Sequence, residues 1–335
     1  MKRIFTLLFA VLTATTIMAQ MHGPMKFVGA SNMTVSTMIN DNPSDTILFA
    51  MNGMESGNIT LPAMKGMQTI PSFTISGATF TLGENHVVTF ADQTFSAKVT
   101  VDGAEKNITG KSLSGTYNMA DNSLSLTVVF QYGKMPFPMT YTVKGYYVKA
   151  VSNPITVTVG GQFTYNNDNV TYELRRYKDG GTDKLDVTVP SYSLTNTVMG
   201  DLTLGTYTVK GLVYDEAQGG YYRDYKNDGL KFHFTAVNGG KTTMDKDYEF
   251  AKEMANNILV KYEGSNVSSI VNTFQMGAMP FGIVSVFSAP ATSIEGVNAN
   301  ATAPADGRTY NLAGQRVDNN YKGIVIVNGK KYLRK

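Results

Sequence analysis

The chain contains no cysteine and no tryptophan, and only three of its 335 residues are histidine. The absence of cysteine excludes disulfides, thiolate metal sites, iron–sulfur clusters and cysteine nucleophiles. Charged residues make up only 16% of the chain, whereas glycine is abundant at 32 residues. This balance suits short strands and tight turns better than long solvated helices. The composition therefore predicts an all-β protein, and the length predicts more than one domain.

Long hydrophobic runs are also missing, and the clearest apolar run is residues 4–14. Lys2 and Arg3 precede this run and Ala19 follows it, which is the order of a secretory signal peptide. The run is well short of the roughly 20 apolar residues that a transmembrane helix needs. We therefore predict a signal peptide over residues 1–19, an exported chain that starts at Gln20, and no transmembrane segment.

The net charge of +3 comes from the carboxyl end of the chain. Residues 308–335 hold seven Lys and Arg but only one acid, whereas residues 20–307 hold 20 basic and 25 acidic groups. A nucleic-acid surface needs basic residues that cluster on a folded face. The body of the protein has no such cluster in its sequence, so we do not expect nucleic acid as a partner.

Parts of the chain repeat each other in the same order. Residues 130–137 (FQYGKMPF) return as residues 274–281 (FQMGAMPF), with six identities in eight positions. Two shorter matches lie upstream, at residues 40–42 with 167–169 and at residues 60–62 with 188–190. Because a repeat sets the domain plan, it predicts two successive domains of the same kind.

The repeat also sets the expected boundaries, which are residues 20–149 for the first domain and 150–292 for the second. The distance between the copies grows by 16 residues after residue 190. The second copy must therefore contain an insertion, which we place within residues 215–254 because loops absorb insertions most readily.

Apolar and polar residues alternate within both copies, which predicts half-buried antiparallel strands. The alternating segments are residues 95–101 and 124–130 in the first copy, and residues 155–159, 185–189 and 230–234 in the second. The pair Asp102-Gly103 after the first of them predicts a hairpin turn. In contrast, the spacing of Phe250, Met254 and Ile258 predicts a helix over residues 247–258.

Short Gly, Asn and Asp turns between consecutive strands predict an up-and-down meander. Closure of such a sheet removes its exposed edges. We therefore predict two tandem antiparallel up-and-down β-barrels of eight strands each, followed by a small C-terminal β-hairpin tail.

Each copy resembles the calycin-like β-barrel domain that is common in exported proteins of Bacteroidetes. The resemblance rests on the strand ends at residues 60–62 and 188–190, on residues 200–204 (GDLTL), and on the closing Phe-Gln-x-Gly strand of each half. It covers about residues 25–290 and implies a lipocalin-like barrel. It implies ligand binding only by analogy. The Gly-x-Trp signature of true lipocalins is absent, because the chain has no tryptophan.

Residues 293–335 form a separate tail in which Asn328-Gly329 between β-rich runs predicts a hairpin. The tail resembles the C-terminal sorting domain of cargo for the type IX secretion system. This resemblance is carried by residues 311–317 (NLAGQRV), residues 322–327 (KGIVIV) and the basic end. It implies the export machinery as a partner and a cell-surface or extracellular location, with the periplasm as the alternative. The other interpretation is a hairpin that only extends the fold.

The sequence predicts no catalytic residue, no cofactor-binding residue and no metal ligand. His22, His86 and His233 are isolated from one another, and neither a His-Glu-x-x-His nor a Gly-x-Ser-x-Gly motif is present. Acidic pairs such as Asp183 and Asp186 are a common product of charged turns. We therefore expect no enzyme activity and no cofactor.

Methionine and tyrosine are distributed unequally between the copies. Residues 21–149 hold 11 Met and five Tyr, whereas residues 150–292 hold five Met and 11 Tyr. Thioethers adapt to irregular apolar space, and tyrosine adds a hydroxyl, so we predict a Met-lined first barrel and a Tyr-lined second one. A Met-x-x-Met spacing, as at Met276 and Met279, can hold Cu(I), but on a strand it would place the two sulfurs on opposite faces.

The preferred hypothesis is an exported, non-enzymatic binding protein whose barrels each hold a small apolar or amphipathic ligand. The alternative is a structural or interaction module at the cell surface, with barrels that are filled by side chains. An enzyme of unknown reaction is the least favoured hypothesis. A lined cavity above about 300 Å³ favours the first hypothesis, and two solid cores favour the second.

Overall fold

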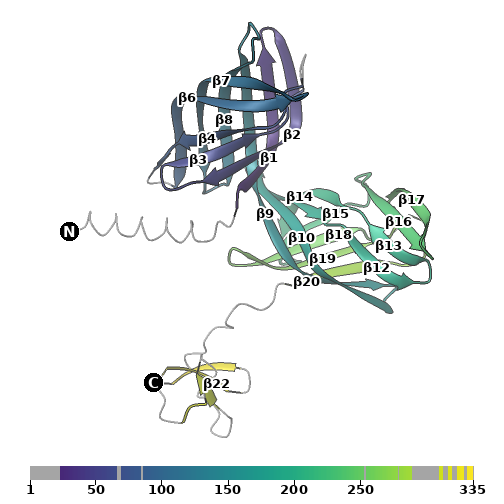
Figure 1. The fold of residues 1–335 in the computed structure, drawn as a ribbon. Coiled ribbons are helices and arrows are strands. Elements are labelled where there is room, and N and C mark those ends of the chain that lie inside the picture. Colours follow the sequence, from purple (N-terminus) through teal and green to yellow (C-terminus); the bar gives the residue numbers. More distant parts are fainter. Residues whose placement is uncertain are drawn as a thin grey trace.

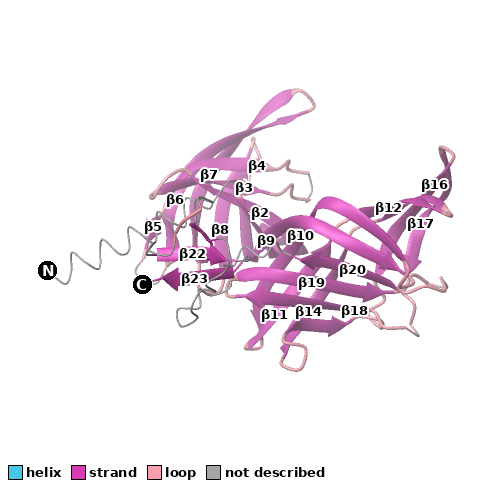
Figure 2. Cartoon of the chain, turned by 90° about the horizontal axis from the view of Figure 1, so that it is seen from below, coloured by secondary structure: helices cyan, strands magenta, loops and turns pink. Residues whose placement is uncertain are grey.

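The computed structural model describes residues 23–65, 69–83, 86–252, 254–277, 279–288, 309–311, 316–318, 323–327 and 330–334. All regular structure within these residues is β-strand (Figure 2), which confirms the all-β prediction. The described part of the chain holds no helix that could cross a membrane. The signal peptide predicted over residues 1–19 lies outside the described residues.

The first half of the chain closes into an antiparallel ring of eight strands, called ring 1. Its strands are β1 (Met25–Val35), β2 (Met38–Met51), β3 (Ser56–Leu61), β4 (Phe73–Thr79), β6 (Val87–Val101), β7 (Ala104–Asn118), β8 (Ser123–Tyr132) and the first part of β9 (Met139–Val159). Consecutive strands pair from β1 to β4 and from β6 to β9, and β9 returns to β1. The remaining gap is closed by β5 (Thr81–Leu82), which continues β4 and pairs with β6.

A side chain replaces a backbone ladder where β4 meets β6. The backbone N–H of Thr79 donates to Oε1 of Gln93 at 2.8 Å, and Nε2 of Gln93 donates to the carbonyl of Thr79 at 2.8 Å. The amide of Gln93 thus forms the pair of hydrogen bonds that a neighbouring strand would otherwise form.

Gln93→Ala is expected to lower the free energy of unfolding by about 1 kcal/mol, because the lost hydrogen bonds are exposed to solvent and each contributes modestly. Chemical denaturation measures the change. Gln218→Ala is the matched control, since Gln218 is an exposed turn residue. Equal stability of the two variants would contradict the role given to Gln93.

The second half of the chain closes a further ring of eight strands, called ring 2 (Figure 1). Its strands are the second part of β9, β10 (Phe163–Asp179), β11 (Thr182–Val189), β14 (Tyr207–Asp215), β15 (Gly220–Asp224), β18 (Asn257–Glu263), β19 (Asn266–Phe274) and β20 (Ile283–Ser288). Because β9 pairs with both β10 and β20, the hydrogen-bonded order returns to its start.

The 21 residues of β9 belong to both rings, and Figure 1 shows the strand running from one ring into the other. Its first part pairs with β8 and β1, and its second part pairs with β10 and β20. The predicted domain boundary between residues 149 and 150 therefore falls inside a strand. A second contact joins the rings, because Nζ of Lys26 lies 2.8 Å from both carboxylate oxygens of Glu173.

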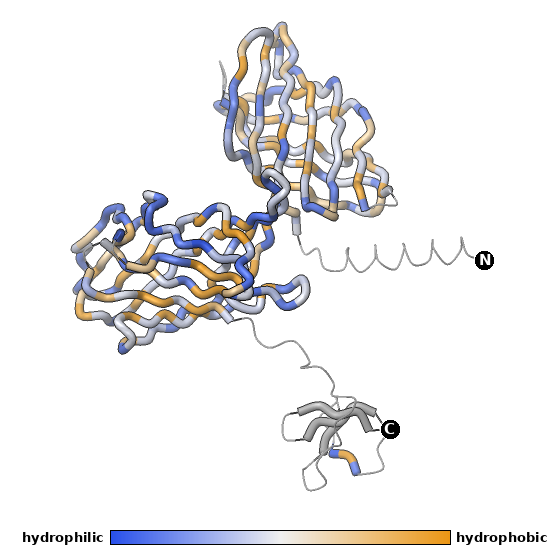
Figure 3. The backbone as a smooth tube through the Cα atoms, turned by 180° about the vertical axis from the view of Figure 1, so that it is seen from behind, coloured by the Kyte–Doolittle hydropathy of each residue, from blue (hydrophilic) through white to orange (hydrophobic). Residues whose placement is uncertain are grey.

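Each ring encloses its own hydrophobic core, formed by residues that alternate along the strands (Figure 3). In ring 1, Phe49 and Phe90 meet edge to face with ring centroids 5.3 Å apart. Methionine is a minority of this core, which consists mainly of Phe, Ile, Leu and Val. The core of ring 2 contains the buried side chains of Tyr172, Tyr207 and Tyr225.

The repeated motif forms the same turn at the end of β8 and of β19. Nε2 of Gln131 donates to the carbonyl of Met135 at 2.5 Å, and Nε2 of Gln275 donates to the carbonyl of Met279 at 2.5 Å. The glycine two residues after each glutamine has a positive φ, of 57° and 46°, which L-residues with a side chain rarely adopt. The repeat is therefore explained by a turn that both rings use after their seventh strand.

A four-stranded side sheet is attached to ring 2. Its strands are β12 (Tyr192–Thr197), β13 (Gly200–Leu204), β16 (Lys231–Asn238) and β17 (Lys241–Glu249). They come from two hairpins, one between β11 and β14 and the other between β15 and β18. The second hairpin lies within residues 215–254, where the sequence places the insertion.

The helix predicted over residues 247–258 is wrong. Residues 247–249 end β17, and residues 257–258 begin β18. Asp247 and Tyr248 pair with His233 and Phe232 on the neighbouring strand. Sheet pairing across the hairpin therefore overrides the helical spacing of the apolar residues.

The C-terminal tail forms a sheet of its own. It consists of β21 (Thr309–Asn311), β22 (Gly323–Val327) and β23 (Lys330–Arg334). β22 and β23 form the predicted hairpin, with Val327 opposite Lys330. Asn328 and Gly329 themselves lie outside the described residues. β21 adds a third strand, which overlaps the start of the strand that the sorting-domain resemblance implies over residues 310–317.

Candidate binding sites

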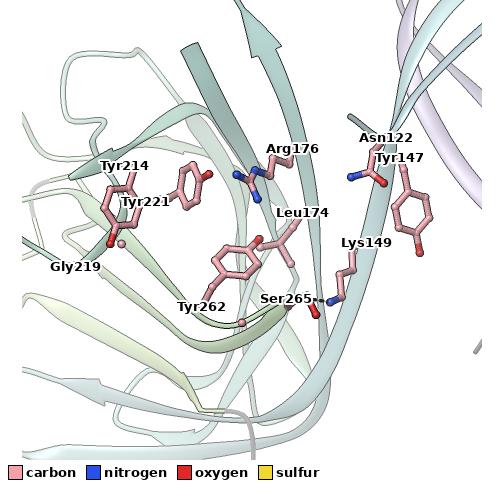
Figure 4. Close-up of a pocket in the computed structure, with 12 residues that line it drawn as sticks. Asn122, Tyr147, Lys149, Leu174, Arg176, Tyr214, Gly219, Tyr221, Tyr262 and Ser265 are labelled. Carbon is pink, nitrogen blue, oxygen red and sulfur yellow. Dashed lines mark hydrogen bonds between the residues drawn. The ribbon is translucent and has the colours of Figure 1, made fainter. Parts of the chain in front are cut away.

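A cleft of about 470 Å³ opens at the end of ring 2 that faces ring 1, and is called the tyrosine cleft (Figure 4). It is lined by Asn122, Tyr147, Lys149, Leu174, Arg176, Tyr214, Gly219, Gly220, Tyr221, Tyr262, Gly264 and Ser265. Asn122 and Tyr147 belong to ring 1, whereas the hairpins β14–β15 and β18–β19 of ring 2 supply the other aromatic residues. The cleft therefore depends on both rings and on the strand that they share.

Three tyrosine rings form the aromatic wall of the cleft. Tyr221 meets Tyr214 with ring centroids 5.8 Å apart and an interplanar angle of 85°, and it meets Tyr262 at 5.9 Å and 73°. Tyr221 is buried, whereas the Tyr214 side chain is 58% exposed. The wall thus has a fixed base and an accessible rim.

Two cationic side chains lie beside this wall. The guanidinium carbon of Arg176 is 5.5 Å from the Tyr221 ring centroid, and Arg176 also forms an ion pair with Asp183 at 3.3 Å. Nζ of Lys149 donates to the carbonyl of Ser265 at 3.0 Å (Figure 4). The cleft therefore combines aromatic surface with two groups that attract anions.

Tyr221 and Tyr262 are neutral hydrogen-bonding groups at neutral pH. Burial, with a smaller contribution from Tyr221, raises the pKa of Tyr262 to about 12. Burial likewise raises the pKa of Tyr221. The phenols consequently keep their protons and can donate hydrogen bonds to a ligand.

A glycine pair allows the β14–β15 hairpin to approach its neighbour. Gly219 has a φ of +65°. A Cβ atom on Gly220 would lie 2.6 Å from the carbonyl oxygen of Val260. A larger residue at this position would push β15 away from β18, which would separate Tyr221 from Tyr262.

A second cavity, the methionine pocket, has a volume of about 390 Å³ and lies against the side sheet. It is lined by Met199, Phe234, Met244, Tyr248, Met276, Met279 and Pro280. Met276 and Met279 line the same pocket because they lie in the turn after β19 rather than on a strand. The expectation that their sulfurs face opposite ways, which assumed a strand, is therefore wrong. This methionine-lined pocket lies in the second half of the chain.

Among the described residues, His86 and His233 lie apart from each other, and the acidic pair Asp183 and Asp186 is used in ion pairs. His86 lies in the turn between β5 and β6, and His22 lies outside the described residues. Asp183 and Asp186 are each paired with an arginine of β10. Within the part of the chain that the structure describes, no three His, Asp or Glu side chains gather so that they could hold a metal ion.

His233 instead forms an exposed ion-pair cluster on the side sheet. Its Nδ1 lies 2.9 Å from Oδ1 of Asp247, and its Nε2 lies 3.0 Å from Oδ1 of Asp245. The hydrogen bond to Asp247 is the largest cause of a raised pKa, and Asp245 adds to it.

We expect NMR titration to give His233 a pKa above the ordinary value of 6.5. Because the folded pKa is raised, the stabilisation by His233 is fully present below about pH 6.5 and is lost as the pH rises through the folded pKa. Asp247→Asn should lower the pKa of His233. An unchanged pKa in that variant would contradict this assignment.

Sequence reasoning did not identify the residues of either cavity. The excess of tyrosine in the second copy is the one signal that points to the cleft, but Tyr214, Tyr221 and Tyr262 come from two separate hairpins. Their meeting depends on which strands become neighbours in the closed ring. No local sequence motif indicates which strands become neighbours.

A match to a known protein family supports the fold of ring 1. Residues 21–146 match the family described as the calycin-like beta-barrel domain, which confirms the predicted resemblance over these residues. A crystal structure described as "a putative outer membrane protein" from Bacteroides fragilis NCTC 9343 is similar at 15% identity, covers 78% of this chain and 94% of that chain, and has a TM-score of 0.25. No curated protein matches the chain significantly.

Proposed function

We propose that the chain is an exported, non-enzymatic binding protein that holds a small amphipathic ligand in the tyrosine cleft. The observation that carries this proposal is the combination, in one cavity of about 470 Å³, of an aromatic wall with Arg176 and Lys149. Cavities of this size that combine aromatic surface with polar groups able to orient a ligand are typical of small-molecule sites. Buried side chains of the described residues fill the ring interiors, which supports a ligand site at the mouth of ring 2 and not inside a ring.

The side chains of the cleft favour a ligand with a ring system and an acidic group. Aromatic rings offer large apolar contact surfaces to the faces of a ligand ring. Lys149 has a backbone carbonyl as its partner in the cleft, so its ammonium can also meet a carboxylate. Arg176 already forms an ion pair with Asp183. An anionic ligand would either replace Asp183 as the partner of the guanidinium or bind the guanidinium together with Asp183.

Cholate is a suitable probe, because it combines a rigid ring system with a carboxylate. We expect isothermal calorimetry on the full chain to show saturable binding of cholate, and cholate to raise the melting temperature. Tyr214→Ala and Arg176→Ala should each weaken binding by about tenfold, which corresponds to 1.4 kcal/mol. Neutral methyl cholate should bind more weakly than cholate.

Lys98→Ala provides the control, because Lys98 is an exposed cation whose partner is Glu105 on the neighbouring strand of ring 1. It should leave cholate binding unchanged. If Arg176→Ala and Lys98→Ala bind cholate equally well, or if methyl cholate binds as tightly as cholate, the cationic part of the cleft does not select the ligand.

The proposal includes export and display at the cell surface or release to the exterior, with the periplasm as the alternative location. The signal-like residues 1–19 and the sorting-like tail of residues 293–335 support it. In this account the tail engages the type IX secretion machinery. Deletion of residues 293–335 in a host with that machinery should leave the protein inside the envelope, as immunoblots of medium and cell fractions would reveal.

A structural or interaction module is the second candidate function. The observation that favours it is the dense aromatic packing in both rings, where Phe27, Phe130, Phe274 and Phe287 are almost fully buried. Such a module would bind no small molecule at the cleft. Failure of the calorimetric experiment with the wild-type chain would favour this candidate over ligand binding.

A further inference from the structure

The methionine pocket is built by segments that have no joint counterpart in ring 1. Met199 lies in the turn between β12 and β13, Phe234 on β16, and Met244 on β17. The turn after β19 adds Met276, and its backbone joins the end of β17 through a bridge between Phe250 and Met276. The pocket therefore arises where the side sheet meets the repeated turn.

The corresponding turn of ring 1 shows what the side sheet changes. Met135, the counterpart of Met279, packs against the core of ring 1, and Met279 likewise packs against the core of ring 2. Both turns have the same glutamine-to-carbonyl hydrogen bond. The turn keeps this structure in ring 2, and there it also forms one wall of a cavity with the side sheet.

The lining of the pocket is almost free of polar groups. The hydroxyl of Tyr248 donates a hydrogen bond to the sulfur of Met244 at 3.7 Å, so the polar end of this side chain already has a partner. Four of the seven lining residues are methionine. Their flexible, polarisable side chains can adjust to apolar ligands of different shapes.

We propose that the methionine pocket is a second binding site, which takes an uncharged apolar ligand and works independently of the tyrosine cleft. The two cavities lie at different ends of ring 2, because the side sheet lies away from ring 1 (Figures 1 and 2). A volume of about 390 Å³ fits a small organic molecule. A Cu(I) site would need several thioether sulfurs to converge on one point. The volume of the methionine pocket is far larger than such a site requires.

Fluorescence titration of the full chain with N-phenyl-1-naphthylamine, a neutral apolar probe, tests the proposal. We expect saturable binding of one probe molecule per chain. Met279→Trp should weaken binding by at least about tenfold, because an indole ring fills space that the probe needs. Met199→Trp fills the pocket from a different segment and should act in the same way. The melting temperature shows whether each variant is folded.

Two control variants test whether the probe binds in this pocket and not elsewhere on the chain. Met54→Trp adds the same indole at a methionine that is 48% exposed and should leave probe binding unchanged. Tyr214→Ala removes part of the tyrosine cleft and should also leave it unchanged, so failure of the cleft proposal and failure of this one can be told apart.

Replacement of Met199, Met244, Met276 and Met279 together by leucine distinguishes apolar binding from thioether chemistry. The apolar volume is roughly conserved, so probe affinity should stay within about threefold of wild type. Unchanged binding in both folded Trp variants would overturn the proposal. Loss of binding in the folded leucine variant, or displacement of the probe by one equivalent of Cu(I) in the wild-type chain, would overturn it as well.

Discussion

Replacement of Arg175 by methionine is expected to lower the free energy of unfolding by about 3 kcal/mol, because it leaves a buried carboxylate without its cation. The side chain of Asp186 is only 5% exposed and is paired with Arg175. Arg175 also donates from Nη1 to the carbonyl of Val28 in ring 1 at 3.1 Å. One side chain thus neutralises a buried acid of ring 2 and binds the backbone of ring 1. Denaturation by urea would measure the loss.

The double variant Arg175→Met, Asp186→Asn is the matched control. The N–H of Gly211 donates a hydrogen bond to the Asp186 side chain at 2.8 Å, and the amide oxygen of the introduced asparagine would still accept it. Because no unpaired charge stays buried, the double variant should recover much of the lost stability. If it is as unstable as Arg175→Met alone, the loss comes from the packing of the arginine and not from its charge.

Phe274→Ala and Phe130→Ala are expected to cost about 3–5 kcal/mol each, because deletion of a fully buried aromatic side chain removes apolar contacts and leaves a cavity. Both side chains have 0% exposure, and each occupies the first position of the repeated motif. The measurement is again the free energy of unfolding in denaturant.

The last position of the same motif provides an internal control for both copies. Phe137 and Phe281 are 55% and 50% exposed. Their replacement by alanine should change stability by no more than about 0.5 kcal/mol, as for other surface substitutions. A large effect at Phe281, or a small one at Phe274, would contradict the burial described for the motif.

The strands of the rings could be predicted because their pattern is local. Leu124, Leu126, Val128 and Phe130 alternate with less buried residues along β8, as a period of two requires. The turn before β7 was also predictable, since Asp102 and Gly103 both have positive φ in a two-residue hairpin.

Features that depend on distant neighbours could not be predicted in this way. The prediction of a helix over residues 247–258 was wrong because residues 247–249 pair with strand β16. The cavities were missed for a related reason, since Met199 and Met276 are far apart in sequence and meet only through the side sheet. The spacing of residues along the chain does not indicate such contacts between distant segments.

Hydrogen exchange along β9, resolved by NMR, tests most directly whether ring 2 is closed and shares this strand with ring 1. Residues 155–159 pair with β10 on one side and with β20 on the other. Consecutive amides of this segment should therefore all be protected, as should those of residues 139–147 in ring 1. Protection of only every second amide in residues 155–159 would show an open edge, and with it a ring 2 that does not close.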